Sequence, residues 1–187
     1  LLRDTLLFVE DRSFETHFGL DFKAIARAAW ANLRAGRVTQ GGSTLTQQLV
    51  KSYFLTNERS WRRKAREAVM SVLLEWRFSK EEILTAYINE IYLGQDGNRA
   101  VHGFALASQF YFARPLRELS PAEMAALVAM VRGPSYYSPE RFADRLKARR
   151  DRIIAGMGAA GLLDATAEAP ALATTHVVAR RKADRRN

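Results

Sequence analysis

The sequence predicts a mainly α-helical domain, and three observations lead to this fold class. Apolar residues recur at helical spacing in several segments, and two segments carry the Ser-x-x-Glu pattern of a helix capping box. Alternation typical of strands is scarce. The chain has 187 residues, 48% of them hydrophobic and 26% charged, which suffices for one folded domain with a sizeable core.

In the first half of the chain, residues 2–9 form an apolar-rich segment that precedes Glu10. Residues 22–33 are expected to form an amphipathic helix that ends near Gly36. Residues 34–40 are expected to form a small hairpin or loop. A further helix is expected from Ala65, because apolar residues there follow i, i+4, i+7, i+8 and i+11, which predicts one buried stripe. The stripe consists of Ala65, Val69, Val72, Leu73 and Trp76.

In the second half, a capping box at residues 79–82 opens a helix that continues to Gly94. A second box at Ser120, with proline at the first helical position, opens the run to Val131. Ser138 and Pro139 begin another helix, which extends through Met157. After Gly161 the sequence becomes rich in Ala, Thr, Glu and Pro. Residues 1–164 are therefore expected to form the domain and residues 165–187 a linker.

The segment 41–51 reads Gly-Gly-Ser-Thr-Leu-Thr-Gln-Gln-Leu-Val-Lys, which is unusually polar for a core helix. The paired glycines would let the chain approach a ligand, and a helix starting near Ser43 would point free backbone amides at it. Lys51 adds a cation one turn later. We therefore predict a site for an anionic, hydroxyl-rich ligand. Five neutral side chains would supply hydrogen bonds, namely Ser43, Thr44, Thr46, Gln47 and Gln48.

The net charge of +9 fits a partner that is anionic, such as nucleic acid, lipid headgroups or a phosphorylated substrate, and charge alone does not choose among them. The chain has no cysteine, which excludes disulfides and thiolate metal sites. Its three histidines lack the spacing of metal ligands, and it contains neither a Ser-His-Asp arrangement nor a Walker loop.

Two acidic positions flank the polar segment. Glu10 and Asp11 follow an apolar helix, and a carboxylate beside an apolar wall is suited to act as a general base, although an ordinary surface acid is the alternative. Glu67 stands among cations, at i+4 from Arg63 and i+3 from Lys64. The excess of cations would bind a diphosphate, and the alternative is a solvated, salt-bridged helix face. The cations are Arg59, Arg62, Arg63, Lys64 and Arg66.

One apolar helix face also leaves two readings open. Phe22, Ile25, Trp30 and Leu33 would form either part of the core or, if they face outward, a surface that dips into a membrane.

Taken together, five segments resemble the successive motifs of the peptidoglycan glycosyltransferases, the polymerase module of class A penicillin-binding proteins. Residues 94–99, 103–112 and 133–137 resemble the one-B type of these enzymes most. Ile153-Ile154 and Ile88 depart mildly from the usual pattern. The five segments are residues 10–19, 42–51, 63–67, 80–89 and 149–154.

This resemblance implies a lysozyme-like glycosyltransferase fold with a larger globular lobe and a smaller, membrane-facing lobe, expected between Gly19 and Gly41. It implies polymerisation of lipid II into β-1,4 glycan strands, with inversion and release of undecaprenyl diphosphate. The implied partners are lipid II, the growing glycan strand and the membrane surface, with no nucleic acid. A transpeptidase domain and an anchor are expected in the parent chain, at the outer, periplasmic face of the bacterial inner membrane.

The resemblance also assigns roles. Glu10 and Glu67 are expected to be catalytic, Glu10 as the base. Glu67 would position the cations or hold a divalent ion such as Mg²⁺ or Mn²⁺, and no other cofactor is implied. The substrate-binding residues would be Asp11, Phe14, Ser43, Gln47, Gln48, Lys51, Arg59, Arg63, Lys64 and Asn89. A lytic muramidase and a basic binding module for nucleic acid or anionic membrane are the alternatives; lipid II turnover separates both from a polymerase.

Overall fold

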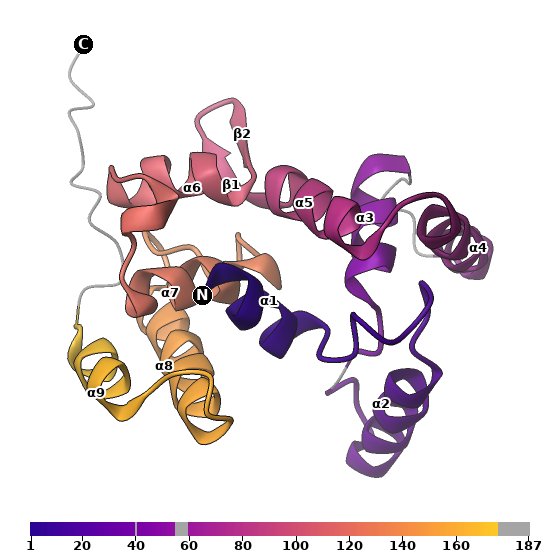
Figure 1. Cartoon of the computed structure of the whole chain (residues 1–187), viewed down its shortest axis with the longest axis horizontal. Coiled ribbons are helices and arrows are strands. Elements are labelled where there is room, and N and C mark those ends of the chain that lie inside the picture. Colours follow the sequence, from indigo (N-terminus) through magenta and orange to yellow (C-terminus); the bar gives the residue numbers. More distant parts are fainter. Residues whose placement is uncertain (40, 55–59, 176–187) are drawn as a thin grey trace. The chain divides into compact units, whose positions relative to one another are not determined.

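The computed structural model describes residues 1–39, 41–54 and 60–175 (Figure 1). In this described part, nine α-helices, one 3-10 helix and a two-stranded antiparallel sheet confirm the mainly α fold class. The chain divides into two compact units. Unit 1 comprises Leu1–Val9 together with the described residues from Ile91 onward, and unit 2 comprises Glu10–Glu90.

Unit 2 holds helices α2 (Phe22–Ala35), α3 (Leu45–Phe54), α4 (Trp61–Arg77) and α5 (Lys80–Glu90), and α3 packs against both α4 and α5. Helix α2 ends at Gly36, as expected, where the backbone turns left-handed at φ 63°. The segment in which the smaller lobe was expected, residues 19–41, belongs to unit 2.

Helix α2 begins at a strong cap. The carboxylate of Asp21 accepts a hydrogen bond from Ala24 N at 2.8 Å and another from the Ser13 hydroxyl. These two donors favour the charged carboxylate, and the Ser13 hydroxyl is the larger cause of the lowered pKa of Asp21. The same contacts bind the loop before the helix to the helix itself.

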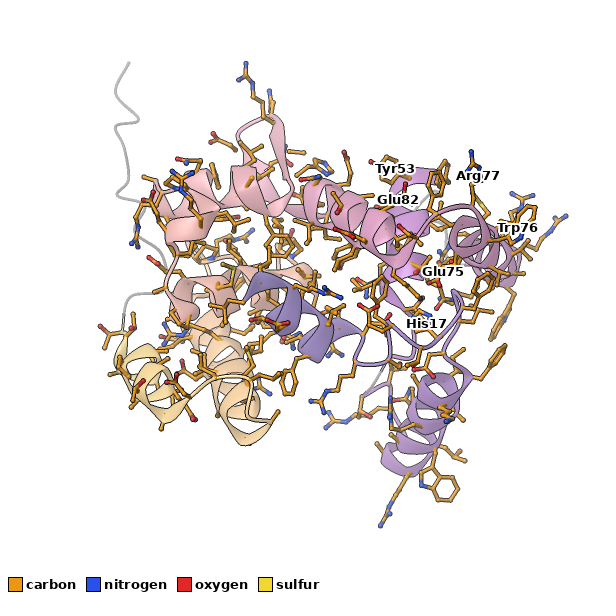
Figure 2. All side chains as sticks on the ribbon, viewed as in Figure 1. His17, Tyr53, Glu75, Trp76, Arg77 and Glu82 are labelled. Atoms are coloured by element: carbon orange, nitrogen blue, oxygen red, sulfur yellow. The ribbon has the colours of Figure 1, made fainter. Side chains whose placement is uncertain are left out.

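The prediction of a buried apolar stripe on α4 is wrong, because the helix is turned the other way. Its buried residues are Glu67, Ser71 and Glu75, spaced four apart, while Val69, Leu73 and Trp76 are 55 to 78% exposed. Figure 2 shows Trp76 on the outside of α4. The polar stripe is turned inward because each of its members finds hydrogen-bond or ionic partners within unit 2.

Unit 1 contains the larger apolar core. Helix α7 is its centre: nine of its residues are buried, it packs against α8 and α9, and it starts at the predicted capping box of Ser120 and Glu123. The elements of this unit follow in chain order. They are α1 (Leu2–Glu10), β1 (Tyr92–Asp96), β2 (Arg99–His102), α6 (Phe104–Phe112), η1 (Leu116–Glu118), α7 (Pro121–Val131), α8 (Ala143–Ala159) and α9 (Ala165–Ala173). The last residue of α1, Glu10, already belongs to unit 2.

Of the two structures expected for residues 34–40, a hairpin or a loop, the described residues 34–39 take the loop, and the hairpin of this chain lies later in the sequence. Residues 34–39 end α2 and continue as a loop, whereas β1 and β2 pair in antiparallel fashion. The helix expected to reach Gly94 therefore stops at Glu90. Gly94 has φ 155°, and a Cβ there would lie 2.1 Å from the Tyr111 hydroxyl oxygen, so this position of the strand requires glycine.

Part of the segment expected to be a linker is helical. Helix α9 packs against α7 and α8, and its capping residue is Asp164. The fully buried Arg150 donates from Nη2 to the carbonyl oxygen of Thr174 at 2.6 Å, which attaches the chain after α9 to α8. Among the described residues, no helix has the length and hydrophobicity that a bilayer-spanning segment needs.

Candidate active site

The polar segment 41–51 becomes the start of α3, and its first turn is buried. Thr44 caps the helix reciprocally with Gln47: Thr44 N donates to Gln47 Oε1 at 3.0 Å, and Gln47 N donates to Thr44 Oγ1 at 3.1 Å. Leu45 N donates to Asp11 Oδ2 at 2.9 Å. The expectation that these amides point freely at an anion is therefore wrong, because protein side chains occupy them.

The two glycines before this turn differ. A Cβ on Gly42 would lie 2.8 Å from the Cα of Ile25 in α2, so Gly42 lets the chain pack closely on that helix. A Cβ on Gly41 would meet no atom within 4 Å. The expected role of the pair, close approach to a ligand, therefore does not describe Gly42.

A buried charge network fixes the loop that follows Glu10. His17 Nε2 lies 2.9 Å from Asp11 Oδ2, and His17 Nδ1 lies 3.6 Å from Glu75 Oε1. Lys80 Nζ lies 2.5 Å from Glu75 Oε2, and Thr46 Oγ1 donates to Glu75 Oε1 at 2.6 Å. Figure 2 labels His17 and Glu75 at this junction. The network joins α3, α4 and α5, and the pairing of its side chains offsets the free-energy cost of burying them.

Three residues predicted to bind substrate lie inside unit 2. Asp11, Phe14 and Gln47 are at most 7% exposed, and Gln47 caps α3. The Phe14 ring packs edge-on against His17 at a centroid distance of 5.9 Å, and the Lys80 ammonium lies 4.6 Å from the ring centroid. These buried side chains therefore stabilise the structure of unit 2 and are not exposed to a ligand.

Glu10 is partly exposed and is held by an amide. Gln48 Nε2 donates to Glu10 Oε2 at 3.3 Å, and the hydroxyl of Tyr87 donates to Gln48 Oε1 at 2.8 Å. Tyr87 is fully buried, and burial together with the charges of Glu10 and Asp11 raises its pKa well above the ordinary value, so the phenol keeps its proton. The sequence analysis assigned no role to Tyr87, and its position within the fourth of the five segments, residues 80–89, was the signal that could have found it.

Glu67 is paired with the two cations that its helical spacing predicted. Arg63 Nη1 donates to Glu67 Oε2 at 2.7 Å, and Lys64 Nζ donates to Glu67 Oε1. Lys64 Nζ also donates to Ser43 Oγ at 2.9 Å, which links α4 to the segment before α3. Within the described chain, Arg63 Nε is buried without a hydrogen-bond partner, so this guanidinium retains an unused donor.

Binding a divalent ion was the alternative role for Glu67, and the structure pairs its carboxylate with two cations. Both of its oxygens accept from cations, and in the part of the chain that the structure describes no three histidine, aspartate or glutamate residues are grouped as metal ligands would be. The two ion pairs of the Glu67 carboxylate orient the side chains of Arg63 and Lys64.

The other predicted substrate-binding residues are placed as follows. Lys51 is exposed in the last turn of α3. Asn89 is exposed near the end of α5, two residues after Tyr87 and therefore about 200° around the helix from it. The prediction for Arg59 lies outside the described residues.

Unit 2 thus brings together a partly exposed carboxylate and a cation pair on either side of residues 43–48. A carboxylate of this kind can remove a proton, and cations of this kind can bind an anion. Comparison with known proteins agrees: residues 1–158 match the transglycosylase family, and the chain belongs to this family.

Similar proteins indicate which type of transglycosylase this chain resembles. Penicillin-binding protein 1B of Vibrio cholerae is 54% identical over 154 residues, which are 82% of this chain and 20% of that protein. Penicillin-binding protein 1B of Escherichia coli is 52% identical over 154 residues, 82% of this chain and 18% of that protein. A crystal structure of penicillin-binding protein 1A from Haemophilus influenzae aligns at 25% identity with a TM-score of 0.49, over 74% of this chain and 17% of that one.

These matches confirm the resemblance to the peptidoglycan glycosyltransferases of class A penicillin-binding proteins, and specifically to the one-B type. The chain spans about a fifth of the length of the 1B relatives.

Proposed function

We propose that this domain polymerises lipid II into β-1,4 glycan strands, with inversion at the anomeric carbon and release of undecaprenyl diphosphate. One observation carries the proposal. Residues 43–48 contact both candidate groups, Glu10 through Gln48 and the Glu67 cation pair through Ser43 and Lys64. A base and a cation set therefore flank one short segment, as a displacement from a diphosphate donor requires.

Glu10 is assigned the role of general base. The acceptor is the 4-hydroxyl of lipid II, which must lose its proton as it attacks the anomeric carbon of the growing strand. Glu10 is partly exposed, so a hydroxyl can reach it, and the amide of Gln48 fixes the direction of its carboxylate. A single displacement with the base on the acceptor face inverts the anomeric centre from the α to the β configuration.

The cations are assigned to the leaving diphosphate. Arg63 and Lys64 share the single negative charge of Glu67, so the three together keep one positive charge. The side chain of Lys64 is 40% exposed, and the exposed Lys51 adds a further cation. Such preorganised charge stabilises the diphosphate as negative charge develops on it. Glu67 acts here by holding Arg63 and Lys64 in place.

The membrane side of the proposal rests on α2. The helix buries Ala28 and exposes its large apolar residues: Phe22, Trp30 and Leu33 are 68 to 77% exposed, and Ile25 is 41% exposed. At 100° per residue these four fall within an arc of about 140°. Helix α4 exposes a second apolar face. We assign these faces to the lipid surface that holds the substrate, at the outer side of the inner membrane.

The deciding experiment is polymerisation of labelled lipid II by the wild-type chain and by Glu10→Gln. The variant should lose at least about 100-fold in rate while still binding lipid II, because only proton removal is impaired. Glu15→Gln is the matched control: it makes the same exchange five residues along, at an exposed side chain, and should keep the wild-type rate.

Three results would refute the assignment. If Glu10→Gln formed glycan strands at the wild-type rate, Glu10 would not be the general base. Consumption of polymeric glycan instead of lipid II would identify a lytic muramidase. Steeply salt-dependent binding of bulk DNA without lipid II turnover would identify a nucleic-acid-binding module. Adding a chelator to the same assay tests the role of a divalent ion, and an unchanged rate would agree with the pairing of Glu67.

A further inference from the structure

The amide of Gln48 has only one workable orientation in this site. A side-chain amide offers one oxygen as acceptor and one NH2 group as donor. Gln48 stands between the hydroxyl of Tyr87, 2.8 Å from Oε1, and Glu10 Oε2, 3.3 Å from Nε2. If the amide were turned over, its oxygen would face the oxygen of an ionised carboxylate, and the two acceptors would repel each other.

Tyr87 stabilises this orientation by donating its hydroxyl proton to Gln48 Oε1. The side chain is fully buried, so no solvent competes for the hydroxyl. The phenol also stays protonated, since burial and the charges of Glu10 and Asp11 disfavour the phenolate. The hydrogen bonds therefore run in one direction, from Tyr87 to Gln48 and from Gln48 to Glu10.

We propose that Tyr87 is a positioning residue for Glu10 that acts through the amide of Gln48. The inference rests on the proposed function, in which Glu10 is the base. Tyr87 lies beneath Gln48 and does not contact substrate; its hydroxyl fixes the amide, and the amide fixes the carboxylate toward the acceptor hydroxyl. This assigns Gln48 to the base, whereas the sequence had placed it among the substrate-binding residues.

The substitution Tyr87→Phe isolates this function, because phenylalanine keeps the buried ring and removes only the hydroxyl. Without that donor, the amide of Gln48 is free to rotate, and Glu10 spends less time in the reactive direction. We expect kcat for lipid II polymerisation to fall about fivefold, the rate equivalent of one hydrogen bond, and KM to stay within about twofold.

A matched control separates this effect from loss of stability. Tyr111 is likewise a buried tyrosine, and its hydroxyl donates to the carbonyl oxygen of Leu93 at 2.9 Å in unit 1. Tyr111→Phe should lower the melting temperature about as much as Tyr87→Phe and leave kcat unchanged. A merely structural role for Tyr87 predicts equal kcat in both variants.

A double-mutant cycle tests whether Tyr87 acts through Gln48. Gln48→Leu removes the link, so Tyr87→Phe should add no further loss of kcat in that background. The inference is overturned if Tyr87→Phe keeps the wild-type kcat, or if its fivefold loss multiplies with that of Gln48→Leu. These outcomes leave the proposed function untouched, because Glu10→Gln tests the base separately.

Discussion

Replacing Lys80 by methionine tests the buried charge network of unit 2. Lys80 Nζ lies 2.5 Å from Glu75 Oε2, and the Glu75 side chain is only 2% exposed. Methionine is a linear side chain of similar length, and it removes the charge, including the ammonium that lies 4.6 Å from the centroid of the Phe14 ring. The substitution therefore leaves a buried carboxylate without its closest cation.

The structure sets the size of the effect. Breaking a buried ion pair by removing one partner costs about 3–5 kcal/mol. We expect the lower end, about 3 kcal/mol, because Lys80 is 24% exposed and the Thr46 hydroxyl still donates to Glu75. For a chain of this length, that loss corresponds to a fall in melting temperature of about 6–12 °C.

The assay is thermal and urea denaturation of wild type, Lys80→Met and a matched Lys147→Met. Lys147 pairs with Asp151 at 2.6 Å, almost the same distance, but the two side chains are 37% and 25% exposed. Solvent screens that pair, so its loss should cost no more than about 0.5 kcal/mol. Burial of the carboxylate is thus the variable that the two substitutions compare.

Two comparisons of stability test whether the buried carboxylate of Glu75 depends on Lys80. If Lys80→Met lies within about 1 kcal/mol of Lys147→Met, the buried carboxylate does not depend on its partner. The double variant Glu75→Gln/Lys80→Met supplies a second check. Since it removes the uncompensated charge, it should be more stable than Lys80→Met alone.

Two further predictions concern packing and the membrane. Gly42→Ala forces a methyl group against the backbone of α2 and should cost about 1–3 kcal/mol in denaturation experiments, whereas the neighbouring Gly41→Ala should stay within about 0.5 kcal/mol of wild type. Equal stabilities would contradict the contact. Trp30→Ser and Leu33→Ser should each weaken sedimentation with phosphatidylglycerol vesicles roughly tenfold, and Leu106→Ser, also an exposed apolar residue, should not. Unchanged binding in the first pair would exclude α2 as the lipid-binding face.

The parts of the site that depend on local spacing could be predicted from the sequence. Arg63, Lys64 and Glu67 lie on one helix, where i, i+3 and i, i+4 neighbours meet, and the structure pairs them. Capping is equally local, so the start of α7 at Ser120 was predicted correctly. The link between Glu10 and Tyr87 joins residues 77 positions apart, and no spacing rule reaches that far.

The direction of α4 shows a different limit. Periodicity places residues on a common face, but it does not say which face is turned inward, and apolar residues are assigned to the core by default. In α4 the opposite face is buried because Glu67 and Glu75 have cations within reach, and each satisfied carboxylate removes the usual penalty for burying charge. The exposed Trp76 then has no protein surface to cover it within the described residues of unit 2.

The polar start of α3 illustrates why buried polar residues resemble binding residues in a sequence. Thr44, Thr46 and Gln47 supply hydrogen bonds, as a ligand site would, yet they donate to or accept from the protein itself. Only Ser43 and Gln48, at the ends of that stretch, extend to Lys64 and Glu10. The interior residues make the turn rigid, and a rigid turn holds Glu10, the proposed base, and the cations at fixed places, which is what preorganised catalysis requires.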